Sequence, residues 1–154
     1  MEQKLDEMIA SSIKKFKQSQ IKAYEKVNAV MCTFFLDFGK ELFHSDCKIT
    51  LGKIFYRIVS DTMCFKSSSS SLFSISNLHY IESFYCLFGQ YVSENTTAID
   101  KLALVAWEYH KVIIDNVSNT EEALFFVDEM INHNFSLEEF KEFIKNKKAS
   151  STQR

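Results

Sequence analysis

The sequence contains no proline and only three glycines, at positions 39, 52 and 89. These two residue types punctuate sheets and form tight hairpins, so their scarcity argues against a sheet-rich fold. Charged residues make up 25% of the chain and hydrophobic residues 46%, as in an ordinary globular protein. A chain of 154 residues with fifteen Phe, six Tyr and one Trp suits a single domain with an aromatic core. We therefore expect helices joined by short polar loops.

The sequence also has few patterns of side chains that could bind a metal ion or act in catalysis. The four cysteines, at positions 32, 47, 64 and 86, have the spacing of no zinc motif, and we expect free thiols. The four histidines lie far apart, and the sequence has no glycine-rich phosphate loop. No nucleophile, base and orienting group can be named together. The sequence thus predicts a protein that is not an enzyme and holds neither metal nor cofactor.

The sequence has no apolar run of about 18 residues and no charged-then-apolar leader. A membrane-spanning helix needs the first feature and a secretory signal needs the second. We therefore expect a cytoplasmic protein without membrane contact.

Apolar residues recur at steps of three and four, which predicts an all-α fold of about six helices in one compact domain. The first stretch, to about residue 42, is predicted as one long helix or as two abutting ones that meet at the polar residues 18–20. A second helix begins near Thr50. We expect the domain to span residues 1–147 and residues 148–154 to form a frayed tail. Four later helices are predicted. One begins after a serine cap at 74 or 76, the next covers about 98–116, the third runs from Asn119 to Asn134, and the last begins after Ser136.

Several blocks of sequence, taken in order, resemble the N-terminal helical domain of the YhcG-type family. That domain, of unknown function, is usually fused to a PD-(D/E)XK nuclease. The most specific block is S-x-x-N-L-x-x-I-x-x-F-Y at residues 74–85. The other blocks are Val27-Asn28 with residues 35–40, Gly52-Lys53 with residues 58–60, Trp107 with His110, and Phe125-Phe126 with Ser136.

The resemblance implies a helix-turn-helix-like middle that binds nucleic acid, with residues 74–88 as its reading helix. Two departures limit what it implies here. The carboxylate–lysine constellation of the nuclease is missing from the sequence, so the catalytic activity does not carry over. The arginines that surround the N-L pair in the family are also missing; their places are held by Ile75, Ser76, His79, Tyr80, Glu82 and Ser83.

Charge is distributed unevenly along the chain. Residues 67–140 carry two basic and eleven acidic side chains, whereas residues 1–66 and 141–154 are net basic. Affinity for nucleic acid comes largely from lysine and arginine at phosphates, so an acidic middle segment opposes readout through residues 74–88. An acidic surface instead attracts basic partners.

The function that we predict is therefore non-catalytic protein binding. The partner would be a basic protein that handles nucleic acid, for example a CRISPR effector nuclease blocked by a small inhibitor from a phage or mobile element. The residues proposed for this contact are the acidic ones of the last two predicted helices: Glu121, Glu122, Asp128, Glu129, Glu138 and Glu139.

Two alternatives remain. The first is a nucleic-acid-binding regulator or nuclease accessory subunit that uses two lysine clusters, provided that they meet in space. The second is a structural subunit that forms a homodimer through its aromatic helices. The lysine clusters comprise Lys14, Lys15, Lys17 and Lys22 near one end and Lys145, Lys147 and Lys148 near the other.

Overall fold

The computed structural model describes residues 2–68 and 71–152, and all regular structure in this part of the chain is α-helical. The all-α prediction is confirmed, but the predicted number of helices is too low. Two short helices, α2 and α5, are too brief for a periodic pattern to show. The described residues form eight helices: α1 (Glu2–His44), α2 (Cys47–Leu51), α3 (Ile54–Ser67), α4 (Ile75–Glu94), α5 (Ala98–Ala103), α6 (Trp107–Asn116), α7 (Thr120–His133) and α8 (Leu137–Thr152).

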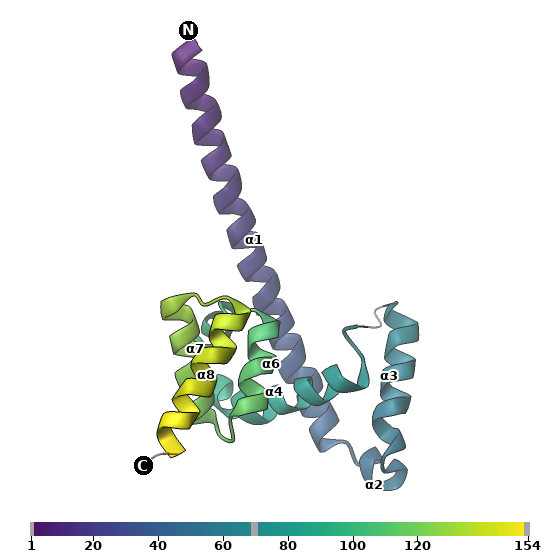
Figure 1. Ribbon diagram of the computed structural model, residues 1–154. Helices are drawn as coiled ribbons and strands as arrows, with labels where there is room; N and C mark the ends of the chain where they lie inside the picture. Colours follow the sequence, from purple (N-terminus) through teal and green to yellow (C-terminus); the bar gives the residue numbers. More distant parts are fainter. Residues whose placement is uncertain (1, 69–70, 153–154) are drawn as a thin grey trace.

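The long N-terminal helix α1 is unbroken over 43 residues. Its polar residues 18–20 do not interrupt it, because Gln is a good helix former and a single Ser costs little inside a helix. The Ser19 hydroxyl donates to the Lys15 carbonyl at 2.9 Å. Figure 1 shows that the first half of α1 extends away from the other helices, whereas the second half passes through the body of the molecule. The body begins near Asn28, whose amide Nδ2 donates to the carbonyl of Ala103 in α5.

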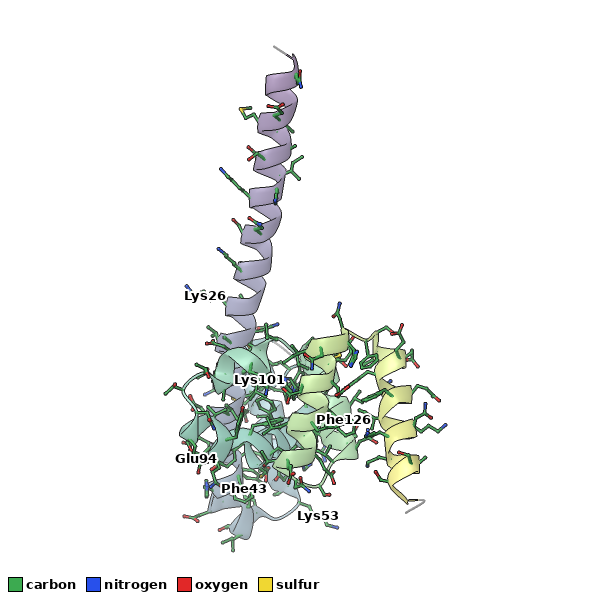
Figure 2. The ribbon with its side chains drawn as sticks, turned by 90° about the vertical axis from the view of Figure 1, so that its left-hand side faces the viewer. Lys26, Phe43, Lys53, Glu94, Lys101 and Phe126 are labelled. Carbon is green, nitrogen blue, oxygen red and sulfur yellow. The ribbon has the colours of Figure 1, made fainter. Side chains whose placement is uncertain are left out.

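Helix α4 lies at the centre of the core. Four of its apolar side chains, Leu78, Ile81, Phe84 and Phe88, are completely buried. It packs closely on α1 at Gly39, where a Cβ atom would lie 2.5 Å from the carbonyl oxygen of Ile81. This contact therefore requires a residue without a side chain on α1. In Figure 2, α1 lies along one edge of the molecule and α8 along the opposite edge.

The start of α4 is fixed by polar contacts. The Ser74 hydroxyl accepts from the backbone N–H of Asn77, so the predicted serine cap is confirmed. Asn77 is itself buried; its Nδ2 donates to the Leu72 carbonyl at 2.6 Å, and its Oδ1 accepts from Trp107 Nε1 at 2.8 Å. These bonds join the loop before α4 to the start of α6.

The helix predicted over 98–116 is divided into α5 and α6 by residues 104–106. The division leaves the carbonyl of Leu102 near the end of a helix, and the buried His110 ring bonds it through Nε2 at 2.9 Å. The other ring nitrogen, Nδ1, is buried without a partner. Burial lowers the pKa of His110 from 6.5 to about 4, so the ring is neutral at physiological pH.

The last two helices have the caps that the sequence predicts. The Asn119 side chain accepts from the Glu122 N–H at the start of α7, and Asn134 ends α7 in the left-handed conformation with a φ of 50°. The Ser136 hydroxyl accepts from the Glu139 N–H at the start of α8. Helix α8 continues to Thr152 and so includes residues 148–152, which the sequence analysis assigns to the tail. No helix in the described part of the chain is both long and apolar enough to cross a membrane.

Candidate protein-binding groove between α7 and α8

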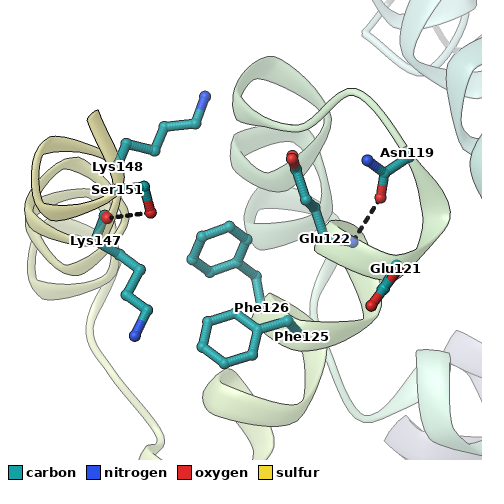
Figure 3. A pocket seen from close by; sticks show the side chains of 8 residues that line it. All are labelled: Asn119, Glu121, Glu122, Phe125, Phe126, Lys147, Lys148 and Ser151. Carbon is teal, nitrogen blue, oxygen red and sulfur yellow. Dashed lines mark hydrogen bonds between the residues drawn. The ribbon is translucent and has the colours of Figure 1, made fainter. Parts of the chain in front are cut away.

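Helices α7 and α8 run in opposite directions on one side of the molecule, joined by the short connection 134–136. The end of α8 therefore lies beside the beginning of α7. Between these two ends is an open groove of about 710 Å³, shown in Figure 3. Its volume lies within the range of roughly 300–1,000 Å³ that is typical of ligand pockets. We call it the α7–α8 groove; it is lined by Asn119, Glu121, Glu122, Phe125, Phe126, Lys147, Lys148 and Ser151.

The floor of the α7–α8 groove is aromatic. Phe126 is buried and its ring lies 6.4 Å from that of Phe140 and 6.2 Å from that of Phe143, both on α8. The adjacent Phe125 is 39% exposed and faces the groove. Neighbouring residues on a helix point about 100° apart, so two consecutive Phe lie on different parts of the helix surface. Sequence reasoning missed the exposed Phe125, and its adjacency to Phe126 gave no signal, because consecutive apolar residues such as Phe35 and Leu36 can both be buried.

One wall of the groove is acidic. Glu121 and Glu122 belong to the first turn of α7, where free backbone N–H groups and the helix dipole stabilise negative charge. The Glu122 carboxylate also accepts from the Ser118 N–H at 3.2 Å, and its own N–H is held by Asn119. Figure 3 shows both glutamates on the first turn of α7, with Glu122 nearer than Glu121 to the aromatic rings.

The facing wall carries lysines from the end of α8. The ammonium of Lys147 lies 5.4 Å from the centre of the Phe125 ring, a cation–π contact across the groove. Lys148 lies on the same wall, and the Ser151 hydroxyl donates to the Lys147 carbonyl at 3.2 Å. The groove therefore has an apolar floor, one acidic wall and one basic wall.

The structure does not bring the six predicted acidic residues together. Only Glu121 and Glu122 line the groove. The other four lie further along α7 or at the start of α8, and three of them contact a nitrogen of a neighbouring side chain. Asp128 pairs with Lys101 at 2.6 Å and Glu138 with Lys141 at 3.8 Å, Glu129 lies 3.2 Å from His133 Nε2, and Glu139 is exposed in the first turn of α8.

The two lysine clusters do not meet. Lys14, Lys15 and Lys22 belong to the projecting half of α1, and the side chain of Lys17 lies outside the described residues. Lys145, Lys147 and Lys148 belong to the last turns of α8. Both Figure 1 and Figure 2 place these segments at opposite ends of the molecule. A contact with nucleic acid would have to use one cluster at a time or span the body.

Several side chains of α4, the helix expected from the family resemblance to read nucleic acid, are engaged in contacts within the protein. The amide of Asn77, the residue that would contact a base, is buried and bonded on both sides. Further along α4, Glu82 accepts from both Lys48 and Tyr56, and Tyr80 donates to Asp115. These contacts support a packing role for α4.

A protein-family model described as the DUF1016 N-terminal domain matches residues 11–150. Comparisons with curated proteins and with solved structures give no match.

Proposed function

The chain belongs to the DUF1016 N-terminal domain family, in agreement with the resemblance found in its sequence blocks, and from this premise we propose that it is a non-catalytic protein-binding module. The α7–α8 groove carries the proposal. An exposed aromatic side chain surrounded by charged walls is the kind of feature that anchors a partner in a protein interface. The partner would insert an apolar side chain against Phe125 and place a basic group at Glu121 and Glu122.

The surroundings of the groove favour a partner that is basic overall. Residues 67–140 contain only two basic side chains, Lys101 and Lys111, and each is engaged by an acidic neighbour, Asp128 and Glu108. The remaining carboxylates of this segment give the surface of α4 to α7 a net negative charge. Such a surface attracts proteins that present lysines and arginines, as proteins that bind nucleic acid do.

We therefore propose a basic protein that handles nucleic acid as the partner. By covering the partner's basic surface, the module would compete with phosphate and act as an inhibitor. A CRISPR effector nuclease is one enzyme of this type, and a phage or other mobile element is one source of such an inhibitor. The proposal rests on charge and on the groove.

The alternative function, binding of nucleic acid, is favoured by the exposed lysines of the projecting half of α1. It differs from protein binding in its response to salt. Contacts with phosphate release counterions, so affinity falls steeply as salt rises. A partner anchored on an aromatic side chain in the groove would associate more slowly as salt rises, but would keep most of its affinity.

The experiment is an affinity capture from bacterial lysate with tagged protein, with and without nuclease treatment. We expect a basic protein that survives nuclease treatment and is lost with Phe125→Ser or with the double change Glu121→Lys and Glu122→Lys. The matched control is Phe65→Ser, since Phe65 is 87% exposed on α3, away from the groove. The purified partner is then assayed for nuclease activity with and without the module.

Capture that vanishes with nuclease treatment and at high salt would contradict the proposal. In that case Lys14→Glu with Lys15→Glu should abolish the retention of nucleic acid, while Phe125→Ser should leave it unchanged. Equal loss of the partner with Phe125→Ser and Phe65→Ser would also contradict it, because the groove would then have no special role.

A further inference from the structure

The projecting half of α1 has an apolar stripe that the rest of the chain leaves uncovered. Its side chains Ile9 and Ile13 are 45% and 50% exposed, and further along the helix Val27 and Val30 are 58% and 63% exposed. Isolated helices gain little stability from their own hydrogen bonds and depend on packing of an apolar face. Among the described side chains of α1 no ion pair is found that could replace such packing.

The positions on this stripe alternate in steps of four and three without interruption. This is the heptad spacing of a coiled coil, and it extends over about four heptads, enough to specify one. At 1.5 Å per residue the stripe is about 39 Å long. We call it the α1 seam; its positions are Ile9, Ile13, Phe16, Gln20, Ala23, Val27, Val30 and Phe34.

Apart from Phe34, whose ring meets those of Phe38 and the buried Phe73, the α1 seam does not face the body of its own molecule. The residues of α1 that enter the core are Cys32, Phe35 and Leu36, on a different side of the helix from Val27 and Val30. In Figure 2 no other helix lies along the projecting half of α1. A second helix can therefore lie along this part of the seam, and the exposed Val27 and Val30 extend the uncovered face to the edge of the body.

We propose that the occupant of the α1 seam is the α1 seam of a second copy of this chain, in a parallel two-stranded coiled coil. The seam requires a helix of the same length and the same heptad spacing, and among the described helices only α1 is long enough. Gln20 is the single polar residue in the seam, and one polar residue at such a position sets register and strand number.

The charges beside the seam are compatible with this arrangement. By heptad spacing alone, the flanking pairs of a parallel coil fall at positions 12 and 17, 19 and 24, and 26 and 31, and in the sequence none of these pairs holds two lysines. Like charges therefore do not oppose pairing of identical helices. The bodies, which lie on a different side of each α1, would occupy opposite flanks of the coil.

Light scattering during size-exclusion chromatography, over a range of concentrations, tests the proposal. We expect twice the 17.9 kDa mass of one chain. The double change Ile9→Glu and Ile13→Glu should reduce the mass to that of a single chain. The matched control is Met8→Glu, because Met8 is an apolar residue on the same part of the helix that is 60% exposed and lies outside the seam. This control should keep the doubled mass.

Trp107 fluorescence verifies that each variant retains a folded body, since Trp107 packs between Phe35 and Phe84, far from residues 8–13. Orientation is tested separately with Ile13→Cys under mild oxidation. A parallel pair places the two new thiols together and gives a crosslinked dimer that the unsubstituted chain does not give. An antiparallel pair would place Ile13 opposite Val30 and give no such crosslink.

A single-chain mass at all concentrations would overturn the proposal, as would a doubled mass that survives the double change. A doubled mass without the Ile13→Cys crosslink would overturn the parallel arrangement. The result is independent of the α7–α8 groove, because Phe125→Ser alters capture of a partner without touching the seam.

Discussion

The close contact of α1 with α4 depends on one residue, Gly39. A Cβ atom at this position would lie 2.5 Å from the Ile81 carbonyl oxygen and 2.7 Å from the Cβ of Tyr85. The first of these is a backbone atom of a central core helix, so it cannot move aside as the end of a flexible side chain can. Gly39→Ala would therefore push α1 and α4 apart.

The expected cost can be estimated from two opposing effects. Overpacking of a close contact costs roughly 1–3 kcal/mol. Replacing glycine by alanine inside a helix returns about 0.5–1 kcal/mol through helix propensity. We expect Gly39→Ala to lower the free energy of unfolding by about 1–2 kcal/mol, which for a chain of this size lowers the melting temperature by several degrees.

The assay is denaturant unfolding followed by Trp107 fluorescence. Trp107 is the single tryptophan, and its ring lies 4.4 Å from that of Phe35 on α1 and 5.3 Å from that of Phe84 on α4. It therefore reports on the α1–α4 packing that Gly39→Ala would disturb. Variants are compared at one protein concentration, because self-association alters apparent stability.

Gly89→Ala is the matched control, since Gly89 is also inside a helix. Its Cβ atom would meet only the ring of Tyr85, at 2.7 Å, and that ring is partly exposed and able to shift. We expect a much smaller change, within about 0.5 kcal/mol. If Gly39→Ala unfolds at the same denaturant concentration as the natural chain, or no earlier than Gly89→Ala, the close-contact argument is refuted.

Three further predictions concern single buried residues. Burial holds the pKa of His110 near 4, so between pH 6.5 and 4 the unfolded chain binds a proton that the folded chain does not. The free energy of unfolding should therefore fall by about 3 kcal/mol as the pH falls through this range. In denaturant unfolding, His110→Gln should flatten this pH dependence. Asn77→Ala leaves the Trp107 N–H without its partner and should cost about 1–3 kcal/mol, measured by thermal unfolding; an unchanged midpoint would contradict the bonding described. Burial raises the pKa of the Cys32 thiol to about 11, so a thiol reagent should modify the exposed Cys47 in the native protein and Cys32 only after unfolding, as mass spectrometry can establish.

The helical class and most helix ends were predictable because their causes are local. Ser74, Asn119 and Asn134 act on backbone groups within a few residues, so their caps are legible in the sequence. The division between α5 and α6 was not predictable in this way. It is accompanied by a contact of the His110 ring with the Leu102 carbonyl, inside a core assembled from several helices.

The candidate site was predicted only in part. Charge counts identified Glu121 and Glu122 for one function and Lys147 and Lys148 for another, and the antiparallel pairing of α7 and α8 joined them in one groove. The same counts grouped Asp128 with the acidic surface, although its partner Lys101 comes from α5.

The sequence by itself determined the all-α class, the family, and the caps, since periodicity, sequence blocks and local hydrogen bonds are properties of neighbouring residues. Tertiary structure alone decided which apolar residues stay exposed. Phe125 and Phe126 are adjacent and are the same type of residue. Ile13 belongs to the same pattern of apolar residues, at steps of three and four, as the core residues of α1. Only the packing of distant helices determines that Phe126 is covered while Phe125 and Ile13 remain free to contact a partner.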